Sequence, residues 1–142
     1  MAAIDQTLVS GLLNATTPTG AAGIPGTYTG LGGTAMKVRL NTTLSTPSAA
    51  GTELTGTGYT AGGTAVPAAS TASSAGSAVT LPATSALNWV NGSGGSWSIV
   101  SMDLTSSAGT RAWFGPFTGQ PVVVANGNTF QIAVAGVSIS LT

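Results

Sequence analysis

The chain contains no cysteine and no histidine, and only six of its 142 residues are charged. Without cysteine and histidine there is no disulfide, no thiol nucleophile, no imidazole base and no zinc site of the usual kind. Three basic residues are too few to neutralise the phosphates of a nucleic acid, and three acidic residues offer as little to a basic partner. These absences exclude most classes of enzyme and predict a chain that binds no metal, cofactor or nucleic acid.

Long apolar runs are missing as well. The N-terminal segment carries Asp5 instead of a lysine or arginine, and the 49 residues between Glu53 and Asp103 are uncharged but interrupted by Gly, Pro, Ser and Thr. A membrane helix needs about 20 consecutive apolar residues, and a signal peptide needs a basic start. We therefore expect neither a signal peptide nor a membrane-spanning segment.

Small residues dominate what is present: 82 of 142 are Thr, Ser, Ala or Gly, while 42% of the chain is hydrophobic. Low charge combined with this hydrophobic content is unlike the composition of disordered chains, and the length suits a single domain. Residues 45–78 hold few large side chains, so we expect long Gly/Thr/Ser loops with short strands there.

Alternating apolar and polar residues predict a mainly β fold. In residues 35–41, Met36, Val38 and Leu40 lie on one face of the expected strand, and Lys37 and Arg39 lie on a solvated face. Further strands are expected at 78–82, 97–104, 111–117, 122–124, 129–134 and 137–141. Their spacing and the Gly/Asn turns between them favour an antiparallel sandwich or a jelly-roll-like barrel. Within 97–104 the apolar parity shifts, which indicates a bulge or burial of both faces.

The N-terminal part has a different pattern. Residues 3–14 place Ile4, Leu8 and Leu12 near helical spacing, with Asp5 in the first turn, and this predicts a short amphipathic helix. A connector rich in Gly and Thr follows at 17–34. We therefore expect one domain, in which residues 1–34 form an N-terminal helix and arm and residues 35–142 form the β-sandwich.

Two segments bear a loose likeness to chemical sites. Gly56–Ala61 fits a dinucleotide-binding pattern with Ala at its last position, but Gly62, Gly63 and Pro67 prevent the helix that would hold a pyrophosphate. Glu53 and Asp103 could form an acid pair of the glycosidase type. Solvated or ion-paired surface acids explain them better in a chain with three carboxylate side chains.

Four residues are candidates for contacts between subunits. Trp89 lies beside the flexible NGSGGS stretch and is the leading candidate, with a place in the core as the alternative. Lys37 and Arg39 share a strand face, which is either solvated or paired with a neighbouring subunit. Tyr59 is the anchor of a glycine-rich loop and a fourth candidate contact.

Two segments of the sequence resemble a known group of proteins. They are residues 51–59, GTELTGTGY, and residues 97–142, WSIVSMDLTSSAGTRAWFGPFTGQPVVVANGNTFQIAVAGVSISLT. They resemble small virion proteins of tailed bacteriophages, often labelled tail-fibre-like or capsid decoration proteins. This chain has fewer charges and a longer connector at 17–34 than that group. The resemblance implies a virion component that is made in the host cytoplasm and assembled as a homo-oligomer, for which a trimer is one arrangement.

The expected function is structural and non-enzymatic. We expect a capsid decoration (cement) protein that binds the major capsid protein on the outside of the head, together with other copies of itself. Many weak contacts made at once then give stable attachment. The segments 17–34 and 45–78 are the expected arms. The alternative is a tail-fibre or tail-tip component that recognises the host surface through exposed loops.

Overall fold

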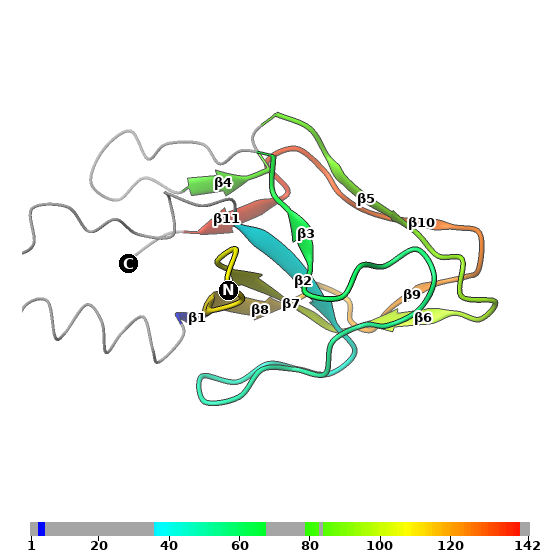
Figure 1. Ribbon diagram of the computed structural model, residues 1–142, viewed down its shortest axis with the longest axis horizontal. Helices are drawn as coiled ribbons and strands as arrows, with labels where there is room; N and C mark the ends of the chain where they lie inside the picture. Colours follow the sequence, from blue (N-terminus) through cyan, green and yellow to red (C-terminus); the bar gives the residue numbers. More distant parts are fainter. Residues whose placement is uncertain (1–2, 5–35, 68–78, 83, 140–142) are drawn as a thin grey trace, which may run out of the picture.

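The computed structural model describes residues 3–4, 36–67, 79–82 and 84–139. In these residues the chain forms eleven β-strands and no helix (Figure 1). The strands are β1 Ala3–Ile4, β2 Lys37–Asn41, β3 Thr64–Ala65, β4 Val79–Leu81, β5 Leu87–Val90, β6 Trp97–Ile99, β7 Ser101–Thr105, β8 Arg111–Pro116, β9 Val122–Val124, β10 Thr129–Ile132 and β11 Val137–Ile139. No helix that could cross a membrane occurs in this part of the chain.

Every strand pairs with an antiparallel neighbour. Five strands form one sheet in the order β1-β8-β7-β2-β3, and the other six pair as the ribbons β10-β5, β11-β4 and β6-β9. The ribbons and the sheet contribute side chains to a common apolar core, which is formed by Val38, Leu40, Leu54, Val66, Leu81, Leu87, Trp89, Trp97, Ile99, Met102, Leu104, Val124, Phe130 and Ile132. The prediction of a mainly β, antiparallel fold is therefore confirmed.

Strand β7 lies at the centre of the five-stranded sheet, and all five of its residues are buried. Met102 and Leu104 pair with Leu40 and Val38 of β2 and face the core. On the opposite face Asp103 pairs with Arg39. The parity shift within 97–104 thus reflects two strands, β6 and β7, and burial of both faces of the second one.

The prediction for Arg39, on the second face of this sheet, was wrong. Arg39 was expected on a solvated face or paired with another subunit, yet its guanidinium forms an ion pair with the fully buried Asp103 of the same chain. A charged side chain can lie there because the segment that follows β2 covers this face, as described below. Asp103 is accordingly a buried acid and not a surface one.

Strands β7 and β8 form the expected hairpin around the turn at residues 106–110. Leu104 pairs with Trp113 and Thr105 pairs with Arg111, so Ala112 is an extra residue on β8. Such a bulge changes which face the following side chains occupy. It places Arg111 on the same face as Asp103.

The N-terminal prediction differs from the structure where it can be compared. Ala3 and Ile4 form strand β1 and pair with Phe114 and Trp113 at the edge of β8, so the expected helix is wrong at these two residues. Pairing with a sheet edge satisfies backbone groups that helical periodicity does not take into account. The rest of the predicted helix, the connector at 17–34 and residues 68–78 lie outside the described residues.

Candidate interaction loop

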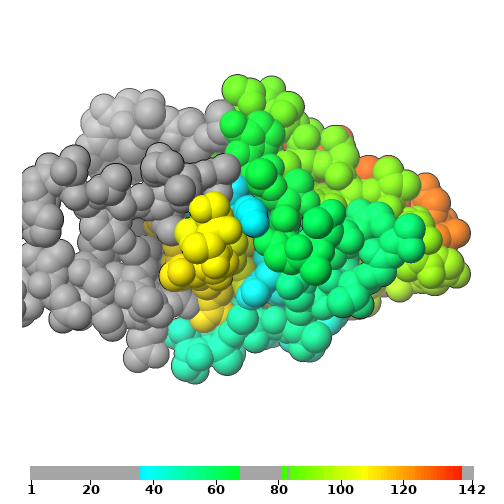
Figure 2. All heavy atoms as spheres, in the orientation of Figure 1, coloured from blue at the N-terminus to red at the C-terminus, as the bar shows by residue number. Residues whose placement is uncertain are grey.

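The segment between β2 and Glu53 leaves the sheet and returns to it, and we call residues 42–52 the pinned loop. Its base is closed by a bridge between Asn41 and Glu53 and by the amide of Thr42, which donates to the carbonyl of Thr52 at 2.8 Å. Its tip is a tight turn between Thr46 and Ala49. Figure 2 shows the loop as a teal projection at the lower edge of the molecule.

Asp103 provides the first anchor of the pinned loop. The hydroxyl of Ser45 donates to Oδ1 of Asp103 at 2.6 Å, while Arg39 pairs with Oδ2. The same hydroxyl accepts a hydrogen bond from the amide of Gly51 at 2.8 Å. A fully buried carboxylate needs an opposite charge and hydrogen-bond donors beside it, and Arg39, whose side chain is 20% exposed, and Ser45 supply them to Asp103.

Asn41 and Ser101 strengthen this anchor. The amide group of Asn41 donates to the hydroxyl of Ser45 at 3.2 Å, and the hydroxyl of Ser101 donates to the carbonyl of Thr43 at 2.8 Å. Both Asn41 and Ser101 are buried. Three side chains from β2 and β7, those of Asn41, Ser101 and Asp103, therefore hold the first half of the loop against the sheet.

Arg111 provides the second anchor. Its Nη1 donates to the carbonyl of Ala49 at 2.7 Å, and its Nη2 donates to the carbonyls of Thr46 and Pro47 at 2.7 and 3.2 Å. The guanidinium also lies over the ring of Phe114, 4.8 Å from its centroid. A planar guanidinium with several donors suits this arrangement, in which one side chain gathers three carbonyls of a turn.

Glu53 and Tyr59 fix the C-terminal side of the base of the pinned loop. Oε1 of Glu53 accepts hydrogen bonds from the hydroxyl of Tyr59 at 2.8 Å and from the amide of Gly62 at 2.7 Å. The Tyr59 hydroxyl in turn accepts from the amide of Leu40 at 3.2 Å. Burial raises the pKa of the Tyr59 phenol well above its ordinary value, and the bond to Glu53 raises it further. The phenol therefore stays protonated and continues to donate.

The pinned loop itself carries no charged residue. Its tip is exposed, and Leu44 beside it is 52% exposed. Among the described residues, four of the five charged side chains hold this loop or its base, namely Arg39, Glu53, Asp103 and Arg111. Most of the charged side chains in the described part of the chain thus serve to fix an uncharged loop.

The anchors leave little scope for acid–base chemistry. Asp103 is fully buried in its ion pair, and Glu53 is hydrogen-bonded to Tyr59 and Gly62. No group of three or more His, Cys, Asp or Glu side chains that could hold a metal ion occurs in the part of the chain that is described.

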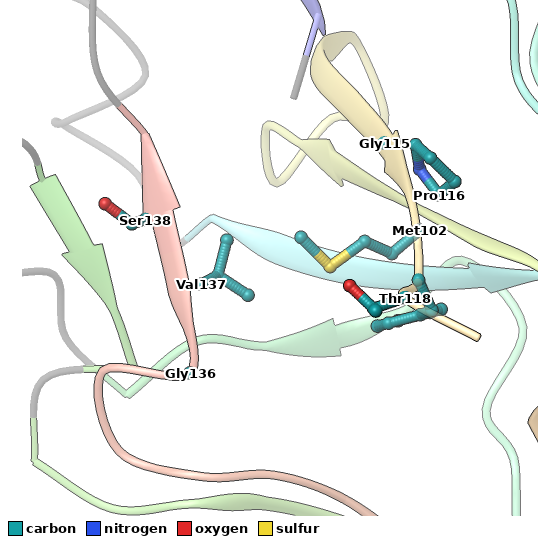
Figure 3. A pocket seen from close by; sticks show the side chains of 8 residues that line it. Met102, Gly115, Pro116, Thr118, Gly136, Val137 and Ser138 are labelled. Carbon is teal, nitrogen blue, oxygen red and sulfur yellow. The ribbon is translucent and has the colours of Figure 1, made fainter. Parts of the chain in front are cut away.

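A groove of about 320 Å³ lies between the end of β8 and β11 (Figure 3). In it the side chains of Met102 and Val137 point toward each other, with Thr118 beside them. The lining residues are all uncharged: Met102, Gly115, Pro116, Phe117, Thr118, Gly136, Val137 and Ser138. The groove can therefore receive a neutral or apolar group but offers no charge to bind an ion.

The four residues singled out from the sequence lie in different places. Arg39 and Tyr59 belong to the anchors of the pinned loop, and Lys37 lies on the same strand as Arg39, half-buried. Trp89 is only 3% exposed, its indole donates to the hydroxyl of Thr64 at 2.8 Å, and its ring lies 5.8 Å from that of Phe130. Trp89 thus occupies the core of its own chain, the alternative considered from the sequence.

Most residues of the anchors were not identified from the sequence. Ser45, Arg111, Asn41 and Ser101 had no assigned role, and Asp103 and Glu53 were considered only as acids. The signal was the opposite charges of Arg39 and Asp103 in two strands of similar alternation, but it becomes useful only when the pairing of β2 with β7 is known.

Comparison of the chain with known protein families, with curated proteins and with solved structures found no match. The resemblance to phage virion proteins therefore remains a prediction from residues 51–59 and 97–142.

Proposed function

We propose that this chain is a structural protein of a phage virion that decorates the outer surface of the head and stabilises it. The observation that carries the proposal is the pinned loop. A chain with six charged residues uses four of them to hold one exposed, uncharged loop in a fixed conformation. An adhesive role accounts for this use of charge, whereas a catalytic role does not.

A fixed loop is well suited to binding another protein. Because its conformation is already set by Arg111 and Asp103, little entropy is lost when a partner binds it. Its neutral tip, with Leu44 exposed, makes contacts that depend little on salt. When many copies bind one particle at several points each, such modest contacts add to a stable attachment.

The proposed partners are the major capsid protein and other copies of this chain, with the strands packed as a sandwich that carries the loop. The proposed place of action is the virion, after assembly in the host cytoplasm. Neither nucleic acid nor membrane is a partner in this proposal, and no enzymatic step is part of it.

A second candidate function is host recognition by a tail-fibre or tail-tip component, and one observation favours it. Three uncharged loops, 56–58, 91–96 and 125–128, meet at the end of the molecule away from β4 and β11 (Figure 1). The fully buried Asn91 organises them, because its amide group donates to the carbonyls of Gly95 and Val124 at 2.8 Å each. Rigid polar loops of this kind suit the recognition of a surface.

Copy number separates the two functions. We expect quantitative mass spectrometry of purified virions to find on the order of hundreds of copies per particle, since a decoration protein binds a repeated lattice. Virions that lack the protein should then break more readily on heating or osmotic shock while adsorbing normally. A handful of copies per virion together with lost adsorption would support the tail function, and absence of the protein from virions would refute both.

A further inference from the structure

We infer that strand β1 is an exchangeable arm: it pairs with β8 of its own chain in an isolated copy and with β8 of a second copy when copies lie side by side. The inference goes beyond the proposed function and does not depend on it. It rests on the β1–β8 pairing, on the edge that β8 presents and on the distance in sequence between β1 and the rest of the sheet.

The pairing is defined by the backbone. Ala3 lies opposite Phe114 and Ile4 lies opposite Trp113, and the two strands are antiparallel. Strand β8 is held on its other side by β7 along its whole length. The slot for β1 therefore exists on β8 without β1, and any copy of the same segment fits it in the same register.

The free edge of β8 is also longer than β1. Strand β8 has six residues, of which β1 covers two, and no other described strand pairs with this edge. An unpaired sheet edge is a template for an extended segment of another chain. Beyond Phe114 the edge continues through Gly115 and Pro116 into the uncharged groove next to β11. The described residues that line this end of β8 carry no charge that would oppose a second copy.

The connection between β1 and β2 leaves the choice of partner open. Residues 5–36 separate the two strands, and a segment of 32 residues spans at most about 110 Å. That reach is several times the radius of gyration of a domain of this size, about 15 Å. The length of this segment therefore does not prevent β1 from reaching the β8 edge of a neighbouring copy.

The two pairings form the same contacts. In either one, two residues of β1 make the same few backbone hydrogen bonds with β8. Exchange of β1 conserves every contact of the pairing, as in domain swapping. Effective concentrations of covalently linked partners lie in the mM range for short flexible linkers, and this value sets the concentration range of the test.

The absence of cysteine from the chain provides a direct test. The variant Ala3→Cys carries a single thiol, to which a benzophenone maleimide is attached. Equal amounts of ¹⁵N-labelled and unlabelled protein are mixed at concentrations from about 10 μM to about 2 mM and irradiated. Mass spectrometry of the crosslinked peptides then shows where the label reacted and whether both peptides carry the same isotope. Val123→Cys, on the exposed strand β9, is the matched control.

We expect Ala3→Cys to crosslink within residues 111–116 at every concentration. The mixed-isotope share of these crosslinks should rise from below about 5% at the lowest concentration to above about 25% at the highest, where half is the limit for complete exchange. The control should yield no crosslink within residues 111–116 above background.

Two results would overturn the inference. One is a mixed-isotope share that stays at the level of the control at all concentrations, which would mean that β1 pairs only within its own chain. The other is crosslinking outside residues 111–116. Because the label could disturb the strand, an isotope-filtered NOE between Ala3 of one wild-type chain and Phe114 of another is measured in the same mixture, and its absence at 2 mM counts against exchange.

Discussion

Replacing Asp103 by asparagine removes the buried negative charge and nearly preserves the size of the side chain. In the folded protein this carboxylate is fully buried, pairs with Arg39 and accepts the hydroxyl of Ser45 at 2.6 Å. The variant Asp103→Asn leaves the Arg39 guanidinium, whose side chain is only 20% exposed, without its counter-charge. The anchor of the loop and the stability of the fold should both suffer.

The expected cost follows from the exposure of the two partners. Breaking a buried ion pair by removing one partner costs about 3–5 kcal/mol, and the 20% exposure of Arg39 places this case near about 3 kcal/mol. For a domain of 142 residues such a loss lowers Tm by about 10 °C. Lys37→Met, on the same strand and the same face, should change the free energy of unfolding by less than about 0.5 kcal/mol.

The assay is urea unfolding followed by tryptophan fluorescence, combined with hydrogen exchange of the loop amides. Asp103→Asn should increase the exchange of the Gly51 amide, which donates to the hydroxyl of Ser45, more than that of the core strands. A loss of stability below about 1 kcal/mol, or unchanged protection of Gly51, would refute the view that Asp103 holds the loop.

Two further experiments test the surroundings of the loop. Because burial and Glu53 raise the pKa of Tyr59 in the folded state, the protonated phenol favours folding; this contribution is complete below pH 10 and declines as the pH rises further. Tyr59→Phe should therefore lower the free energy of unfolding by about 1 kcal/mol at pH 7 and make stability fall less steeply at alkaline pH. Urea midpoints measured between about pH 8 and 11.5 test this. A fall in stability as steep as that of the wild type would contradict this assignment. A Cβ on Gly63, at φ +85°, would lie 2.6 Å from the carbonyl oxygen of Val38, whereas one on Gly62, at φ +84°, would meet nothing within 4 Å. In thermal unfolding, Gly63→Ala should destabilise the protein by about 3 kcal/mol and Gly62→Ala by about 1 kcal/mol. Equal losses of stability would show that the close approach of the Gly63 and Val38 backbones is not the reason for glycine at position 63.

The strands could be predicted from the sequence because their signals are local. Alternation in 35–41 gave the burial of Val38 and Leu40, and the turn at 106–110 indicated the hairpin of β7 and β8. The environment of Trp89 was also encoded locally, since Leu87 and Trp89 alternate with the exposed Asn88 and Val90.

The candidate site depends on contacts that no local pattern contains. Arg39 and Asp103 are 64 positions apart, and Arg111 reaches carbonyls more than 60 positions away. The position of Arg111 also depends on one extra residue, Ala112, which reverses the face that simple alternation would assign. Such contacts follow from strand order and register, which the sequence alone left open.

Binding of the pinned loop to the particle is the central claim, and one measurement tests it most directly. Virions that lack the protein are titrated with wild-type protein, with Leu44→Asp and with Val123→Asp, a control whose original side chain is 66% exposed on β9. We predict that Leu44→Asp weakens binding by at least about 10-fold, because it places an unpaired charge in a neutral contact, while Val123→Asp binds like the wild type. Raising NaCl from about 50 to about 500 mM should change the wild-type Kd by less than about threefold. Unchanged binding of Leu44→Asp, or an equal loss in Val123→Asp, would contradict the account.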